Sequence, residues 1–182
     1  MILAIDPGNT YSAFCVVDER NYEPLYHDKV LNTELMNLVD GLPVTYYNAI
    51  VERVASYGMA VGREVFETCE WIGRYSQMLE DRGHKVAYIY RMEEKRYICH
   101  DSKAKDSNIR QALIDRFAKF DLKNGKGTKD NPDWFYGFKA DEWAAYAVAV
   151  TYLDKWREEH NGNALESTAE GLATGSDAVS GS

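Results

Sequence analysis

The chain has 182 residues, of which 45% are hydrophobic, 13% aromatic and 27% charged. This length suits one domain with a substantial core, and the composition excludes disordered and fibrous proteins. The formal net charge of −8 argues against a general nucleic-acid binder, because phosphate contacts need Lys and Arg.

The basic residues are unevenly distributed along the chain. From Arg74 to Lys129 there are 14 Lys or Arg against 8 Asp or Glu, whereas the residues after Asp154 have 5 Asp or Glu against 2 Lys or Arg. The sequence is therefore compatible with a locally basic face on an acidic protein.

The start of the sequence and its cysteines indicate a cytoplasmic protein. The first residues, MILAIDPG, have no basic segment and their apolar run is broken at Asp6, so we expect no secretory signal peptide. No stretch approaches the roughly 20 apolar residues of a membrane span, so no membrane partner is expected. Cys15, Cys69 and Cys99 are odd in number and lack CxxC spacing, which predicts ordinary thiols.

The first half of the chain predicts strands with one short helix between them. In chain order we expect strands over 2–6, 11–17 and 26–31, a helix over 33–39 and a strand over 48–54. The turn Pro7-Gly8-Asn9 joins the first two strands into a hairpin. Asp6 lies inside the first strand and Glu52 inside the last, where a strand buried on both faces should carry no acid.

The second half predicts helices packed on the sheet. In chain order we expect a helix over 62–82, a strand over 85–90, a helix over 107–117 with Ser107 as N-cap, and a helix over 141–156. After His160 the sequence is small, polar and free of aromatic residues, so residues 161–182 are expected to form a flexible tail. The order of elements indicates one α/β domain over 1–160, with a mixed five-stranded sheet flanked by helices.

Three acids stand beside apolar sequence: Asp6, Glu52 and Asp141. A buried carboxylate is costly unless a cation pairs with it, so we expect the three to converge on a divalent ion. Ligands that are all oxygen favour Mg²⁺ or Mn²⁺ over zinc. In a site with two such ions, one activates water and the other stabilises the leaving oxygen of a phosphodiester.

Each of these acids also has a purely structural explanation. Asp6 precedes Pro-Gly and would cap a turn. Glu52 precedes Arg53 and would form an ion pair on an edge strand. Asp141 would complement the dipole at a helix N-terminus. The metal hypothesis therefore rests on the three acids together.

Three blocks of the sequence resemble the RuvC family of resolvases, within the RNase H-like superfamily. The opening MILAIDPGNTYSAFCVVD resembles a first strand that bears a metal-binding Asp. The second block, AIVERVASYGMAVGREVFETCEWIGR, resembles a strand-borne Glu before a long helix, and KADEWAAYAVAVTYLD resembles the C-terminal helix that completes the metal site. The blocks cover about residues 1–156, and the set is closest to the short RuvC-like proteins of phages.

The resemblance implies an RNase H-like fold and a metal-dependent endonuclease. Such an enzyme is a homodimer that cuts both strands of a four-way (Holliday) junction, so branched DNA is the implied partner and Mg²⁺ or Mn²⁺ the implied cofactor. For a phage-encoded protein the implied location is the host cytoplasm. Carried over position by position, the match gives Asp6, Glu52 and Asp141 as catalytic metal ligands. Hydrolysis would leave a 5′-phosphate and a 3′-hydroxyl.

One position departs from the bacterial pattern, which has a second acid three residues beyond Asp141 where this chain has Ala144. Either three acids suffice, or Glu142 or a loop residue such as Asp133 supplies the fourth metal ligand, or the site is weakened. Glu142 lies about 100° around the helix from Asp141, so it is only a partial substitute.

The segment SKAKDSNIRQALIDRF lies where related resolvases keep a basic residue near the scissile phosphate and a helix that contacts DNA. The phosphate contacts that we expect from this segment are Lys103, Lys105 and Arg110. The alternative is a solvated basic helix face. Near the second block, Tyr57, Met59 and Phe66 would either stack on exposed bases at the junction centre or belong to the core.

Two other functions fit parts of the sequence. The IDPGNT opening also resembles the actin-like ATPase and sugar-kinase superfamily, but that fold needs two lobes and a second phosphate loop, for which this chain has neither room nor motif. A junction-binding architectural protein that no longer cleaves is favoured by Ala144 and by the acidic net charge. The presence of Asp6, Glu52 and Asp141 argues against it.

Overall fold

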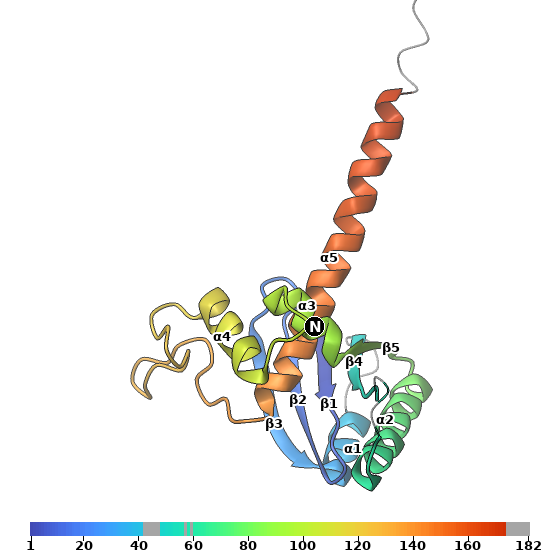
Figure 1. The fold of residues 1–182 in the computed structure, drawn as a ribbon, viewed down its shortest axis with the longest axis vertical. Coiled ribbons are helices and arrows are strands. Elements are labelled where there is room, and N and C mark those ends of the chain that lie inside the picture. The colour runs from blue at the N-terminus through green and yellow to red at the C-terminus, as the bar shows by residue number, and fades with distance from the viewer. Residues whose placement is uncertain (42–47, 57, 59, 174–182) are drawn as a thin grey trace, which may run out of the picture.

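A computed structural model of the chain describes residues 1–41, 48–56, 58 and 60–173. Figure 1 shows a sheet with helices packed on it and a long last helix that runs out of the body. The described strands form one sheet of five, in the order β3-β2-β1-β4-β5. The predicted α/β class with a mixed five-stranded sheet is confirmed.

Along the chain, three strands come first, then helices and strands alternate, and three helices end the order. The strands are β1 (Ile2–Asp6), β2 (Tyr11–Val17), β3 (Pro24–Leu31), β4 (Asn48–Arg53) and β5 (Lys85–Tyr90). The helices are α1 (Asn32–Asp40), α2 (Arg63–Asp81), α3 (Arg91–Cys99), α4 (Asp106–Phe117) and α5 (Glu142–Ala173). β2 is antiparallel to β1 and β3, whereas β4 is parallel to β1 and β5, so the sheet is mixed.

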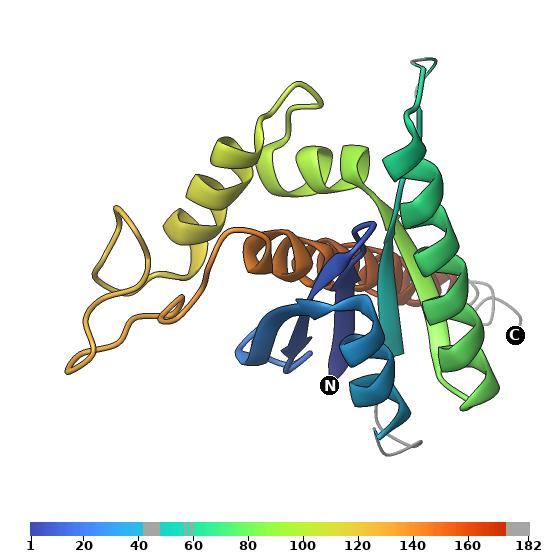
Figure 2. The ribbon, with the colours of Figure 1, turned by 90° about the horizontal axis from the view of Figure 1, so that it is seen from below.

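Side chains of the central strand β1 alternate between two apolar layers. Ile2 and Ala4 face a layer that contains α5, whereas Leu3 and Ile5 face a layer with α1 and α2. Figure 2 shows α5 across one face of the sheet, with α1 and α2 on the opposite side. Burying each large aliphatic side chain stabilises the fold by about 1.5–3 kcal/mol. The two layers therefore hold β1 firmly at the centre of the molecule.

Helix α3 is an element that the sequence analysis does not predict. Its nine residues are mostly polar and only Glu94 is fully buried, so no apolar stripe marks the helix. Its N-terminus is satisfied by Glu93, whose carboxylate accepts the backbone N–H of Tyr90 at 2.8 Å. The helix forms on the strength of this cap and of its packing against α4 and α5.

The other boundaries lie close to their predicted positions, with two local differences. Helix α4 has Lys105 rather than Ser107 as its N-cap, and the side chain of Asn108 accepts the Lys105 N–H at 2.9 Å. Strand β3 begins at Pro24, two residues earlier than predicted. The three cysteines are free thiols, as expected.

Helix α5 is longer than predicted, because its backbone stays helical to Ala173. The added segment is rich in Ala, Glu and Leu, which are strong helix formers. Residues 174–182 lie outside the described residues, and the domain limit at residue 160 with a flexible tail stays a prediction. Within the described part of the chain, no helix is both long and apolar enough to cross a membrane.

The connection between α4 and α5 is organised around a buried carboxylate, that of Asp133. Its two oxygens accept four backbone N–H groups, from Lys119, Phe120, Asp121 and Trp134, at 2.7–3.0 Å. Burial alone would raise the pKa of Asp133, but these hydrogen bonds outweigh it and lower the pKa to about 2. The connection is thereby fixed just before the chain enters α5.

We expect Asp133→Asn to destabilise the protein by about 2–4 kcal/mol, because an amide cannot accept all four N–H groups. The contribution of Asp133 is present above its ordinary pKa near 3.8 and is lost as the pH falls through about 2, because the folded state favours the ionised form. Urea unfolding at pH 7 measures the loss. An unchanged midpoint would show that the four hydrogen bonds contribute nothing net.

Candidate active site

Asp6 and Glu52 lie side by side at the ends of two paired strands. β1 and β4 are parallel and Ile5 pairs with Val51, so the next residue along each strand is one of the two acids. Side chains alternate along a strand, and both acids therefore point to the face that α5 covers. Each carboxylate is partly buried.

The turn after Asp6 is held by polar side chains from other elements. The Ser12 hydroxyl accepts a hydrogen bond from the Gly8 N–H at 3.3 Å and donates one to the side-chain oxygen of Asn32 at 2.7 Å. The side-chain amide of Asn32 in turn donates to the Gly8 carbonyl at 2.9 Å. A Cβ on Gly8 would lie 2.3 Å from the carbonyl oxygen of Tyr11, so the close approach requires glycine. Because Ser12 and Asn32 already hold the turn, Asp6 is not needed to cap it.

Helix α3 brings a third acid to the same place. Glu94 is 0% exposed, and its Oε2 accepts a hydrogen bond from Arg91 at 2.5 Å. The same guanidinium binds Asp106 of α4 at 2.7 Å. Sequence reasoning missed Glu94 and Arg91 because both lie on the unpredicted helix. The available signal was the acidic pair Glu93-Glu94, which begins three residues after the end of β5.

Asp141 approaches from the start of α5. Its backbone carbonyl accepts the N–H of Ala144 at 3.0 Å, which opens the helix, and its side chain forms an ion pair with Lys29 of β3. The carboxylate is 45% exposed, so it sits at the mouth of the site rather than in its floor. The dipole role considered for Asp141 is compatible with this position.

The three predicted acids line one pocket of about 480 Å³. Its walls come from the ends of β1 and β4 and from the first turns of α3, α4 and α5. The lining residues are Asp6, Glu52, Arg91, Asp106, Ser107, Ile109, Arg110, Ala140, Asp141, Trp143 and Ala144. The structure thus brings Asp6, Glu52 and Asp141 to one pocket, and their role as metal ligands stays a prediction.

The acids in the floor of the site perturb one another. Burial raises the pKa of Asp6 well above its usual range, and the charge of Glu52 adds to the effect. Burial and the charge of Glu94 raise the pKa of Glu52 to about 7. Burial likewise raises the pKa of Glu94 to about 8, although the Arg91 guanidinium opposes the shift. Ionising all of these carboxyls would place more negative charge here than the partly buried Arg91 guanidinium can balance.

The residues present fit a hard divalent cation. All the acids are carboxylates, the ligands that Mg²⁺ and Mn²⁺ prefer, and Glu94 Oε1 is buried without a hydrogen-bond partner. Among the described residues, no three His, Cys, Asp or Glu side chains already surround one point as metal ligands. In this arrangement Asp141 is turned toward Lys29, and Glu94 toward Arg91.

No protein-family model matches the sequence, and no curated protein matches it. The RuvC structure from Thermus thermophilus, however, aligns with a TM-score of 0.61 at 16% sequence identity, over 87% of this chain and 96% of that chain. A second structure, T. thermophilus RuvC in complex with Holliday junction substrate, gives a TM-score of 0.61 at 14% identity, over 87% and 95% of the two chains. The chain has a RuvC-like fold.

This RuvC-like fold confirms the predicted RNase H-like architecture. Within it, Glu142 does not join the pocket. Its carboxylate is buried, lies 2.6 Å from His27 Nδ1 and accepts the backbone N–H of Lys139 at 3.0 Å. Asp133, the other residue named as a possible fourth metal ligand, accepts backbone hydrogen bonds in the connection before α5. Ala144 lines the pocket and brings no carboxylate.

The predicted phosphate contacts separate into two groups on the RuvC-like fold. Arg110 lines the pocket, and its guanidinium lies 4.6 Å from the ring centre of Trp143. Lys103 and Lys105 are exposed in the connection that leads into α4, outside the residues that line the pocket. Of the three predicted phosphate contacts, Arg110 is therefore the one that lies in the pocket with the acids.

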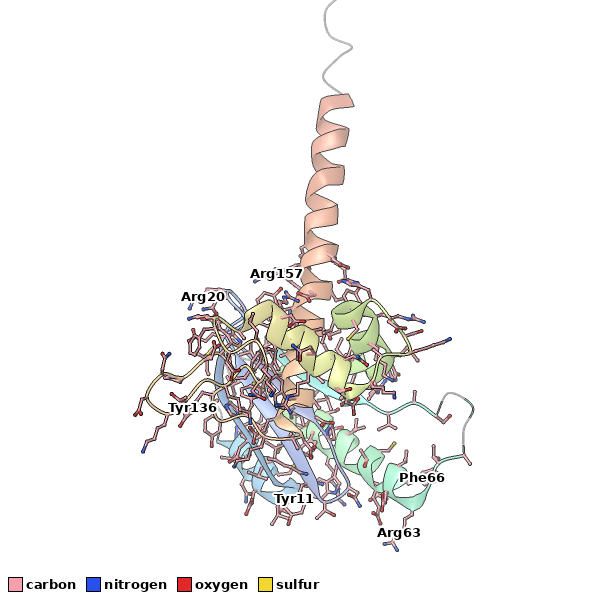
Figure 3. All side chains as sticks on the ribbon, turned by 60° about the vertical axis from the view of Figure 1, so that its left-hand side comes forward. Tyr11, Arg20, Arg63, Phe66, Tyr136 and Arg157 are labelled. Carbon is pink, nitrogen blue, oxygen red and sulfur yellow. The ribbon has the colours of Figure 1, made fainter. Side chains whose placement is uncertain are left out.

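Of the three residues that would stack on bases or belong to the core, the structure describes Phe66, which does not line the pocket. Phe66 is 61% exposed near the start of α2, so it is not a core residue. Figure 3 shows it beside Arg63 at the edge of the molecule. Tyr57 and Met59 lie outside the described residues. The wedge stays a prediction for all three.

We expect the stability of the RuvC-like domain, measured with a chelator, to fall as the pH rises from about 5 to about 8. Between the ordinary pKa near 4.5 and the raised values of about 7 for Glu52 and about 8 for Glu94, the folded state binds more protons than the unfolded state. Raising the pH therefore favours unfolding. Melting temperatures across this range measure the effect.

Glu52→Gln serves as the matched variant for this measurement, because it removes one of the titrating groups. Its melting temperature should fall less steeply over the same pH range. A flat or rising profile in the unaltered protein would contradict the raised pKa values.

Proposed function

We propose that this protein is a divalent-metal-dependent endonuclease that cuts branched DNA, with the four-way junction as its substrate. The observation that supports this most strongly is the convergence of Asp6, Glu52 and Asp141 in one pocket of a RuvC-like fold. A matched RuvC structure is described as bound to Holliday junction substrate, which supports branched DNA as the partner.

In this proposal Asp6, Glu52 and Asp141 would hold Mg²⁺ or Mn²⁺. A bound divalent ion supplies activation of water and stabilisation of the leaving oxygen of a phosphodiester. Hydrolysis leaves a 5′-phosphate and a 3′-hydroxyl. The strand ends keep Asp6 and Glu52 in place, because the paired backbone and both apolar layers hold them. Arg91 limits the repulsion between the carboxylates in the floor of the site.

The DNA backbone would approach over the first turn of α4. Arg110 offers a guanidinium inside the pocket, and the N-terminal end of α4 favours anions. Lys103 and Lys105 extend the basic surface along the connection before α4. These groups would attract phosphate to an acidic pocket on an acidic protein.

A four-way junction presents two symmetry-related strands, so we propose that a homodimer holds two arms and cuts both. The free thiols are compatible with activity in the cytoplasm, the host's if the gene belongs to a phage.

Asp6→Asn should reduce cleavage of a labelled four-way junction by roughly 10³-fold or more, because it removes the acid at the centre of the site. The measurement compares the junction with a linear duplex of the same sequence, in Mg²⁺, Mn²⁺ or chelator. Asp115→Asn, on the exposed face of α4, is the matched control and should cleave normally. Full cleavage by Asp6→Asn would refute the proposed site.

Arg110→Ala should weaken junction binding and reduce the salt dependence of the affinity by about one phosphate contact. Binding is measured in Ca²⁺ or chelator over a series of salt concentrations, so that cleavage does not interfere. Lys85→Ala is the control, because Lys85 begins β5 at the opposite end of the sheet from the acids. Equal salt slopes for Arg110→Ala and the unaltered protein would remove Arg110 from the interface.

A second candidate is a junction-binding protein that does not cleave. Ala144 favours it, because α5 supplies no second carboxylate to the pocket. The actin-like alternative has less support, since the described strands form a single sheet and the two solved structures compared above are of RuvC. Tight junction binding without cleavage in any metal would favour the architectural role.

A further inference from the structure

Glu94 is a buried acid, and its local contacts do not explain why an acid is buried there. The side chain is 0% exposed on α3, and only Oε2 has a partner, the Arg91 guanidinium at 2.5 Å. Oε1 is buried without a hydrogen bond. Leaving a carboxyl oxygen without a hydrogen-bond partner in the interior is costly, so such an atom calls for a ligand or a function.

A purely structural ion pair with Arg91 accounts poorly for this residue. Arg91 also binds Asp106, so its single positive charge is shared between two carboxylates. A buried ion pair seldom stabilises a fold more than apolar side chains of the same size would. An ordinary core position on α3 would therefore carry an apolar residue.

The surroundings of Glu94 identify the missing partner as a cation. Glu94 interacts electrostatically with Asp6 and Glu52, the two acids at the strand ends. All three carboxyls thus interact electrostatically with one another and with one guanidinium, that of Arg91, which lines the pocket together with Asp6 and Glu52. A divalent cation would balance the excess negative charge and give Oε1 the partner that it lacks.

We propose that Glu94 is a further carboxylate ligand of the divalent-cation site, provided from α3. The inference rests on the proposed function, because it takes Asp6 and Glu52 to be the core of that site. Ala144 makes the assignment more specific: the first turn of α5 offers the pocket Asp141 but no second carboxylate there. Glu142 is turned away toward His27, and the pocket's remaining acid, Asp106 of α4, is 80% exposed and already bound by Arg91. Glu94 is therefore the buried acid that can act as the additional ligand, and α3 supplies it.

The test is Mn²⁺ binding to the full chain, read by calorimetry and by the rise in melting temperature when MnCl₂ replaces chelator. Glu94→Gln keeps the shape and the acceptor for Arg91 but removes the charge. We expect its Mn²⁺ affinity to fall at least about tenfold and its Mn²⁺-induced rise in melting temperature to shrink accordingly. Junction affinity in chelator should not fall, since Glu94 is fully buried and cannot contact DNA.

Glu93→Gln is the matched control. Glu93 is the neighbouring acid on α3 but binds Lys155 at 2.9 Å and caps the helix, so its loss should lower stability with and without metal while Mn²⁺ affinity is kept. Glu94→Asp is the second variant, in case Gln prevents folding. It withdraws the carboxylate by one methylene and should weaken Mn²⁺ binding while the chain keeps its charge.

The outcomes separate this inference from the proposed function. If Glu94→Gln and Glu94→Asp bind Mn²⁺ like the unaltered protein while Asp6→Asn does not, Glu94 is only an ion-pair partner of Arg91 and the inference is wrong. If the unaltered protein binds no Mn²⁺, the metal-dependent function fails and this assignment fails with it. Loss of Mn²⁺ binding in both Glu94 variants, while Glu93→Gln keeps its Mn²⁺ affinity, establishes Glu94 as the fourth ligand.

Discussion

The parallel pairing of β1 with β4 is the constraint on which the site depends. Because Ile5 and Val51 are in register, Asp6 and Glu52 must emerge as neighbours on one face. The apolar residues before them are buried between α5 on one side and α1 with α2 on the other, so neither strand can slip without exposing its core face. The energy of the core thus holds two like charges together.

Holding these charges together has an electrostatic cost that the fold offsets only in part. Arg91 stands at the start of α3, directly after β5, and reaches both Glu94 and Asp106. Burial raises the pKa values of Asp6, Glu52 and Glu94, and the neighbouring carboxyls, which one guanidinium does not balance, add to the rise. In the proposed function a bound cation would relieve this cost, so metal binding would be coupled to stability.

The remaining walls of the pocket depend on segments without regular structure. The connection from α4 to α5 is ordered by the Asp133 carboxylate and anchored by Phe135 and Phe138, both 0% exposed. This anchoring delivers Asp141 and Trp143 to the pocket, and Trp143 in turn supports Arg110. A substitution that disorders the connection would therefore displace the start of α5 and the pocket residues on it. The buried residues of the connection do not themselves touch substrate in the proposed function.

The sequence by itself determined the strands, the class of the fold and the convergence of Asp6, Glu52 and Asp141, because apolar periodicity and acids inside apolar runs are local signals. It did not reveal α3, whose polar residues carry no periodic stripe, or Glu94, whose burial arises only when α3 packs beside the strand ends. Glu142 and Asp133 were equally plausible metal ligands in the sequence. Only the tertiary structure showed that His27 and four backbone amides had already engaged them, since hydrogen-bond partners distant in the chain leave no mark on local sequence.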